Sequence, residues 1–179
     1  MEKSNKKILI AIVAVVVIAV VAVVLFVALK PSYKSQIKAF GKAMTDSEKM
    51  EEFVEKKVNL RALYAIEKLE EHDDLDTGDE DAVKKAFEEE YKKAKKSDYE
   101  GKEFVDEVKT IYAFMTALTA GDDDVKVEVK DIGKLEDYDE YSFLKKAKFT
   151  LKLSKDDESE DVELIALFYK GKIVMVTAE

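Results

Sequence analysis

The sequence predicts an α+β fold in which an N-terminal transmembrane helix is followed by about four helices and then by a four-stranded antiparallel sheet. Three observations lead to this prediction. Residues 8–29 form an unbroken run of 22 apolar side chains. From Tyr33 to Ala120 the apolar residues recur with helical spacing, and from Val125 they alternate with polar ones as in strands. Helices that come first and strands that follow them are typical of an α+β domain.

The composition excludes several classes of function. Of the 179 residues, 47% are hydrophobic and 39% are charged. Both fractions are high because many of the hydrophobic residues are concentrated in the apolar run, which leaves the rest of the chain with the composition of a water-soluble domain. The chain has a net charge of −9 and a single arginine, so it lacks the basic face with which proteins neutralise nucleic-acid phosphates. Without cysteine it has no disulfide, thiolate nucleophile, cysteine-bound metal or lipidated cysteine. We therefore expect no nucleic-acid partner and no cofactor.

The apolar run, Ile8 to Leu29, has the length of a membrane-spanning helix. Twenty-two helical residues extend ~33 Å, which is close to the ~30 Å hydrocarbon core of a bilayer. A cleaved signal peptide usually has a shorter apolar region of ~7–15 residues that ends in small side chains. Here bulky Leu29 directly precedes Lys30, so we expect an uncleaved anchor embedded in the lipid bilayer. Pro31 ends the helix because it has no backbone N–H to donate.

The lysines before the anchor predict its orientation. Lys3, Lys6 and Lys7 favour a cytoplasmic N-terminus under the positive-inside rule. Lysines also follow the anchor, which leaves open a reversed orientation with the domain in the cytoplasm. The preferred organisation, for a protein of the cell membrane, is a cytoplasmic tail over residues 1–7, a transmembrane helix over 8–29, a linker over 30–35 and an extracytoplasmic α+β domain over 36–179.

Capping signals separate the first three helices of the domain. A short helix is expected around residues 37–44. The capping-box sequence Thr45-Asp46-Ser47-Glu48 then predicts the start of a second helix, or a kink, and the helix continues to about Leu69. A second box, Thr77-Gly78-Asp79-Glu80, begins the third.

The fourth helix is expected from about Asp98 to Thr119, before Gly121. Its second half, residues 111–118, is apolar almost all round. Such a pattern predicts a helix that is buried on most sides.

Four strands are expected after this helix. Residues 125–129 and 147–153 alternate apolar and polar side chains, so each strand has one face in water. A polar loop over Ser154–Asp161 follows. The last two strands flank Lys170-Gly171 in a tight hairpin and extend over Val162–Tyr169 and Lys172–Thr177. Both are apolar on both faces, which predicts that each face is covered.

This order of elements resembles the small extracytoplasmic domains of bacterial membrane-anchored proteins in the nuclear transport factor-like (cystatin-like) superfamily. The resemblance covers roughly Gln36 to Ala178 and includes the hairpin Tyr169-Lys170-Gly171-Lys172 between hydrophobic strands. It implies a curved sheet wrapped around helices, with a cone-shaped pocket that binds a ligand or partner in many members and is catalytic in some. The chain departs from the family pattern at Ile173, where many relatives have tryptophan, and lacks the lipid-attachment cysteine of lipoprotein members.

Acidic runs offer oxygen ligands that calcium prefers, but their spacing is not that of a known loop. Across residues 73–81 the EF-hand pattern fails, since Lys84 stands where the bidentate glutamate belongs. The alternatives are a looser site and a solvated turn, and the site would use Asp74, Asp76 and Asp79. The run at 122–124 is a further acidic turn. His72 is the only histidine, so a histidine-type zinc site or a Ser-His-Asp triad is excluded without another base. We expect no metal.

A pocket is predicted near Arg61, Tyr112 and Met115. Arg61 is the sole arginine, and bidentate recognition of a carboxylate requires that residue type. The alternative is a structural ion pair or a surface residue with a packed stem. An isomerase-type enzyme could combine Tyr112 with a buried carboxylate from Asp106 or Glu107. The alternative there is a core tyrosine beside two surface acids.

The two-sided apolarity of the last strands predicts an interface. One face can pack on the helices, and the other can close a homodimer or contact a membrane-protein partner. The candidate interface residues are Ile165, Leu167, Tyr169, Val174 and Val176. The main hypothesis is a single-pass membrane-anchored, non-catalytic extracytoplasmic domain that binds a protein partner or small ligand. The alternative is a pocket enzyme of isomerase type with a buried carboxylate and a tyrosine.

Overall fold

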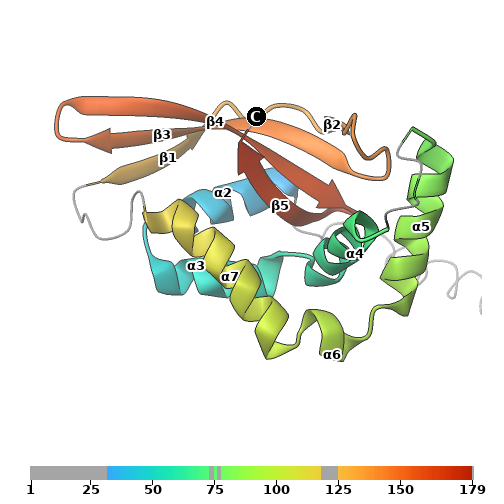
Figure 1. Ribbon diagram of the computed structural model, residues 1–179. Coiled ribbons are helices and arrows are strands. Elements are labelled where there is room, and N and C mark those ends of the chain that lie inside the picture. Colours follow the sequence, from blue (N-terminus) through green and yellow to red (C-terminus); the bar gives the residue numbers. More distant parts are fainter. Residues whose placement is uncertain (1–31, 73–74, 76–77, 118–124, 179) are drawn as a thin grey trace, which may run out of the picture. The chain divides into compact units, whose positions relative to one another are not determined.

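The computed structural model describes residues 32–72, 75, 78–117 and 125–178 (Figure 1). The predicted tail and anchor lie outside these residues. No helix in the described ranges is long and apolar enough to cross a membrane. The described helices are α2 (Tyr33–Ala43), α3 (Ser47–Lys57), α4 (Leu60–Glu70), α5 (Glu80–Lys93), α6 (Lys96–Tyr99) and α7 (Lys102–Ala117). The strands are β1 (Lys126–Lys130), β2 (Glu136–Asp137), β3 (Lys145–Lys155), β4 (Glu158–Tyr169) and β5 (Lys172–Ala178).

The predicted α+β order is confirmed. The described helices all precede an antiparallel sheet with strand order β1-β3-β4-β5, and the short β2 pairs with one end of β3. The sheet is open, with β1 and β5 at its edges. The long β3–β4 pair forms its centre and extends past the helices at one end (Figure 1).

The β4–β5 hairpin has the predicted turn. Lys170 and Gly171 both have positive φ, 50° and 79°, which is the conformation of a two-residue type I′ turn. Such a turn matches the right-handed twist of the strands that it joins.

The β3–β4 connection is tighter than predicted, because no polar loop spans Ser154–Asp161. The strands continue to Lys155 and from Glu158, so that only Asp156 and Asp157 turn the chain. Asp156 has a φ of 51°, which aspartate tolerates better than most residues. The facing charges of Lys155 and Glu158 favour the continued pairing.

The predicted second helix is two helices, α3 and α4. Val58 leaves the helix with a ψ of 138°, and the Asn59 side chain accepts the Ala62 N–H to cap α4. The Asn59 N–H donates to the Ile173 carbonyl at 2.7 Å, so the break is fixed by β5. At the start of α3, Asp46 rather than Thr45 is the N-cap residue.

The predicted fourth helix is also divided. It consists of the four-residue α6 and then α7, which begins only at Lys102. Gly101 lies between them, and a Cβ added there would come within 2.5 Å of the Ser97 carbonyl oxygen. The close approach of the two backbone segments therefore requires glycine.

Helices cover both faces of β4 and β5. One face packs on α2, α3 and α7 in a first core that contains Phe40, Phe149 and Phe168. The opposite face packs on α4 and α5 in a second core that contains Phe87 and Leu167. Figure 1 shows α2, α3 and α7 beneath the sheet and α5 beside its end. The prediction that both faces of these strands are covered is confirmed, and the chain's own helices cover them.

Buried Gln36 joins α2 to the β4–β5 hairpin. Its Nε2 donates to the Gly171 carbonyl and its Oε1 accepts the Ile173 N–H, both at 2.9 Å. These bonds satisfy backbone groups at the edge of β5, which would otherwise be unpaired inside the domain. The hairpin turn is thereby fixed relative to the helices.

Candidate functional site at Arg61

Arg61 lies in the first turn of α4, stacked on two tyrosines. Its guanidinium carbon is 4.6 Å from the ring centroid of Tyr91 on α5 and 5.9 Å from that of Tyr99 on α6. Its Nη2 donates to the Lys92 carbonyl at 3.1 Å, while its Nε is buried and has no hydrogen-bond partner among the described residues. The two rings attract the guanidinium and hold its position, but they do not neutralise its charge.

Arg61 borders an open pocket of about 340 Å³. The pocket is positioned by the α3–α4 junction, α5, α6 and the start of β5, and Lys172 provides a second cation at its wall. The complete lining is Glu55, Lys56, Val58, Asn59, Leu60, Arg61, Tyr91, Tyr99, Glu100 and Lys172.

The acidic residues of this pocket already have lysine partners. Glu55 pairs with Lys109 at 2.6 Å and Glu100 with Lys96 at 3.2 Å. Within the described part of the chain, Arg61 and Lys172 have no carboxylate at ion-pair distance. The pocket therefore holds two cations without counter-ions in a domain of acidic composition.

Lys170 adds a third cation near the same aromatic group. Its Nζ is 5.3 Å from the ring centroid of Tyr91 and 4.8 Å from that of Tyr169. Its hydrogen bond with the Tyr169 hydroxyl raises the pKa of Lys170, which remains charged at neutral pH. The type I′ turn places this lysine, since it gives residues 170 and 171 positive φ.

The structure does not bring Arg61 together with Tyr112 and Met115. Tyr112 lies in the first core, with its ring 6.3 Å from those of Phe40 and Phe53, and Met115 packs at the margin of that core. Burial raises the pKa of the Tyr112 hydroxyl, and the nearby Val176 backbone lowers it. The hydroxyl nevertheless lies outside hydrogen-bonding geometry with that backbone, and it has no hydrogen-bond partner in the part of the chain that the structure describes.

The carboxylates considered for isomerase chemistry lie in solvent. Asp106 and Glu107 are exposed on α7, whereas the Tyr112 ring is surrounded by aromatic and aliphatic side chains. The only buried polar residues among those described are Gln36 and Thr116. The arrangement of a core tyrosine beside two surface acids is therefore the one observed.

The five candidate interface residues lie in the interior. Leu167, Tyr169, Val174 and Val176 are buried, and Ile165 is partly buried. A bulge in β5, where Leu167 pairs with Met175 but Phe168 pairs with Ile173, leaves Val174 as an extra residue that packs in the second core. These side chains stabilise the domain, and a partner surface has to lie on the exterior.

Such an exterior surface occurs on α7, where sequence reasoning did not expect it. The prediction that residues 111–118 are buried on most sides is wrong for the described part, because Ile111 is 55% exposed and Phe114 is 74% exposed. Glu103 and Glu107 precede them at four-residue steps and share their face. We call these four residues the α7 face.

Glu67 on α4 lies near the α7 face. The pKa of Glu67 is raised by partial burial and by the neighbouring Glu107, although Lys68 lowers it. Within the described residues, neither Glu67 nor the two glutamates of the α7 face forms an ion pair. The α7 face thus combines exposed apolar side chains with uncompensated negative charge.

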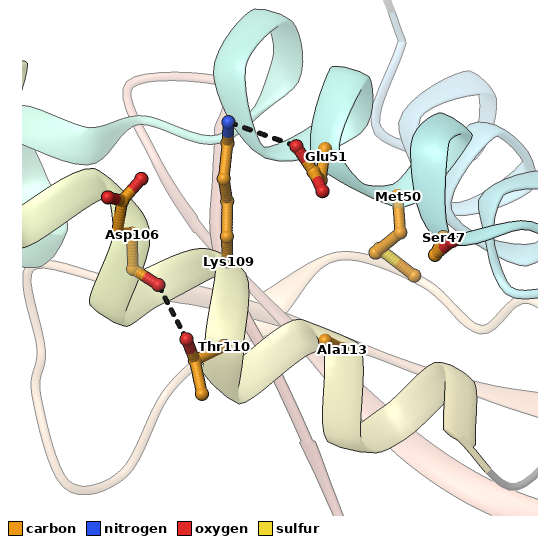
Figure 2. Close-up of a pocket in the computed structure, with 7 residues that line it drawn as sticks. All are labelled: Ser47, Met50, Glu51, Asp106, Lys109, Thr110 and Ala113. Atoms are coloured by element: carbon orange, nitrogen blue, oxygen red, sulfur yellow. Dashed lines mark hydrogen bonds and ion pairs between the residues drawn. The ribbon is translucent and has the colours of Figure 1, made fainter. Parts of the chain in front are cut away.

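A groove on the other side of α7 is held together by ion pairs. It measures about 270 Å³ and lies between α3 and α7 (Figure 2). Lys109 reaches across to α3, where its Nζ is 3.2 Å from Glu51 and 2.6 Å from Glu55. Its charge is therefore used in joining the two helices. The groove is lined by Ser47, Met50, Glu51, Asp106, Lys109, Thr110 and Ala113.

The described residues contain no cluster of acidic or histidine side chains that could hold a metal ion. Asp79 caps α5 by accepting the backbone N–H groups of Asp81 and Ala82. The Nε2 atom of His72 lies 3.7 Å from Glu90, and the His72 side chain is 42% exposed. Asp74, Asp76 and residues 122–124 lie outside the described residues.

No protein-family model, curated protein or solved structure matches the chain. The resemblance to the nuclear transport factor-like superfamily therefore stays a prediction from the sequence. The function has to be inferred from the surfaces of the domain itself.

Proposed function

We propose that the protein is a single-pass membrane protein whose extracytoplasmic domain is a non-catalytic module that binds a protein partner through the α7 face. The observation that carries this proposal is the exposure of Ile111 and Phe114 on a helix whose other side is buried. Large apolar side chains held in water by a rigid helix are typical of interaction sites.

The charge around the α7 face specifies the chemistry of the partner. Glu103 and Glu107 stand beside the two apolar side chains, and Glu67 is close to Glu107. An amphipathic segment with lysine or arginine next to its apolar residues would complement this surface. A membrane neighbour is the favoured source, because residues 8–29 are predicted from the sequence to lie in the bilayer.

The alternative function, a pocket enzyme of isomerase type, needs a carboxylate beside the Tyr112 hydroxyl. The described neighbours of that ring are apolar and aromatic. Binding at the α7 face is therefore the function that the geometry favours.

Photo-crosslinking from position 114 tests the proposed surface. The full-length chain, with a photoreactive amino acid in place of Phe114, should give one heavier adduct with a basic partner in the cells that produce it. The adduct should disappear when Glu103→Lys and Glu107→Lys are combined. The same amino acid at Ala113, which is exposed on the other flank of α7, is the control and should give no such adduct.

Two results would contradict this proposal. If the adduct still formed with the charge-reversed variant, the acidic residues would not contribute to binding. If the adduct had twice the mass of the chain, the partner would be a second copy of the protein. Orientation is tested separately, because protease added to intact cells should digest an extracytoplasmic domain and leave a cytoplasmic one untouched.

A further inference from the structure

We propose that the Arg61 pocket is a binding site for a small oxyanion, a carboxylate or phosphate group held by Arg61 and Lys172. This inference concerns a different surface from the α7 face and does not depend on it. Its basis is a guanidinium that is packed and oriented but has no counter-ion among the described residues.

The lack of a counter-ion is unexpected from composition. The chain has 39 aspartates and glutamates against 30 lysines and arginines, so a structural arginine would readily find an acidic partner. The two glutamates of the pocket wall are instead paired with Lys109 and Lys96. The charge of Arg61 therefore remains available to a ligand.

The geometry suits a guanidinium specifically. Tyr91 and Tyr99 lie beside Arg61 with their rings, so these two residues take up none of the guanidinium N–H groups. One Nη2 hydrogen is used by the Lys92 carbonyl, and Nε is buried. The Nη1 group is neither buried nor hydrogen-bonded within the described residues, and it can donate to an oxyanion that enters the pocket. A lysine could not combine this stacking with planar donors.

The surroundings limit the size and charge of the ligand. The pocket of about 340 Å³ accepts a small molecule, and Lys172 can neutralise a second negative oxygen. Beyond the pocket the acidic domain repels extended polyanions. A soluble phosphate or carboxylate is therefore expected, and the phosphate of a lipid headgroup would offer the same chemistry.

Titration of the full-length chain in zwitterionic-lipid nanodiscs tests the site. Inorganic phosphate and succinate are added separately while the NMR signals of Tyr91 and Tyr99 are followed. Saturable shifts are expected with at least one anion. Arg61→Lys should weaken its affinity about tenfold or more, because planar donors are lost. Lys172→Gln should also weaken it, and this exposed residue can be replaced without disturbing the stacked tyrosines.

Controls separate this site from general charge effects and from the α7 face. Lys126→Gln removes an exposed cation on β1, at the opposite edge of the sheet from Lys172, and is expected to retain binding. Phe114→Ser should retain anion binding even though it removes the apolar side chain of the α7 face. Arg61-dependent binding to vesicles that contain phosphatidylglycerol, without binding of free anions, would support the site and assign the lipid headgroup as the source.

The proposal is overturned if phosphate, succinate and the anionic vesicles all leave the tyrosine signals unchanged. It is equally overturned if Arg61→Lys and Lys172→Gln bind the anions as tightly as the unchanged chain. Because the Lys172 side chain is exposed, Lys172→Gln should leave the far-UV circular dichroism and the Tm unchanged, and a loss of binding with both unchanged is not due to misfolding.

Discussion

The hydroxyl of Tyr112 is a polar atom placed in an apolar core without a hydrogen-bond partner. A buried group of this kind costs the folded state its lost hydration. We therefore expect Tyr112→Phe to leave the free energy of unfolding unchanged or to raise it by up to about 1 kcal/mol. Chemical denaturation of the Ser32–Glu179 domain measures this. A loss of more than about 1 kcal/mol would mean that the hydroxyl has a partner, as the isomerase alternative requires.

Glu67 is a second residue whose environment opposes its charge. Burial and Glu107 raise its pKa above the usual 4.5, so the protonated form is favoured in the folded state. The stability gained from protonation is fully present below about pH 4.5 and is lost as pH rises through the folded-state pKa. Glu67→Gln should therefore raise the Tm at pH 7, and the difference should shrink as the pH falls through the folded-state pKa and be lost below about pH 4.5.

Glu89→Gln is the matched control for this pH dependence. Glu89 is exposed on α5, away from the α7 face, and its replacement should change the Tm little at either pH. An effect of Glu67→Gln that does not vary with pH would show that the carboxylate charge is not its cause.

Single residues differ in how much of their role the sequence reveals. Arg61 stands out as the only arginine, yet Tyr91, Tyr99 and Lys172 come from three other elements and have no fixed spacing from it. The lack of a counter-ion is a property of the folded chain, so the sequence alone could not predict it. The pocket, with its two cations that lack counter-ions among the described residues, forms only where α4, α5, α6 and β5 pack together.

At the scale of elements, Gly41 allows α2 to approach the sheet. A Cβ at this position would lie 2.2 Å from the Cγ2 atom of Val129 on β1, and a β-branched valine cannot easily move away. We expect Gly41→Ala to destabilise the domain by about 1–3 kcal/mol. A double-mutant cycle checks the cause, because in a Val129→Ala background the same change should cost little. Tolerance of Gly41→Ala in the unchanged domain would contradict this packing.

Elements are predictable from sequence where local chemistry defines them. The Lys170-Gly171 turn is indicated by a glycine, which accepts positive φ, between two apolar runs. The alternation in β1 and β3 is indicated by strands that have one face in water. The break at Val58 and Asn59 depends instead on a hydrogen bond to Ile173 in the last strand. Asn59 and Ile173 are far apart in the sequence, so the pattern of residues around Asn59 does not reveal this hydrogen bond. A single helix was therefore expected there.

The α7 face shows a different limit of sequence patterns. A helix that is apolar almost all round indicates contacts on most sides, but the pattern does not say which contacts lie within the chain. The described domain covers Tyr112 on one side of α7 and leaves Phe114 in water on another. This exposed apolar surface is the basis for the partner proposed at the α7 face.

For the whole molecule, the two cores should unfold together because they share β4 and β5. Phe168 lies in the first core and Leu167 in the second, on opposite faces of one strand. Leu167→Ala should lower the free energy of unfolding by about 2–5 kcal/mol. Ile37 lies in the first core, and the NMR signal of its methyl groups reports the unfolding of that core. Leu167→Ala should shift the denaturation midpoint of this signal by the same amount as the midpoint measured by far-UV circular dichroism.

The exposed Phe114 provides the contrast for this whole-domain test. Phe114→Ser removes an aromatic ring that makes little contact with either core and should change stability by only about 0.5 kcal/mol. If Leu167→Ala shifted only the second core, the faces of β4 would belong to separate folding units. Equal movement of both signals, with Phe114→Ser near neutral, is the outcome expected of one cooperative domain in which the exposed Phe114 side chain contributes little to folding.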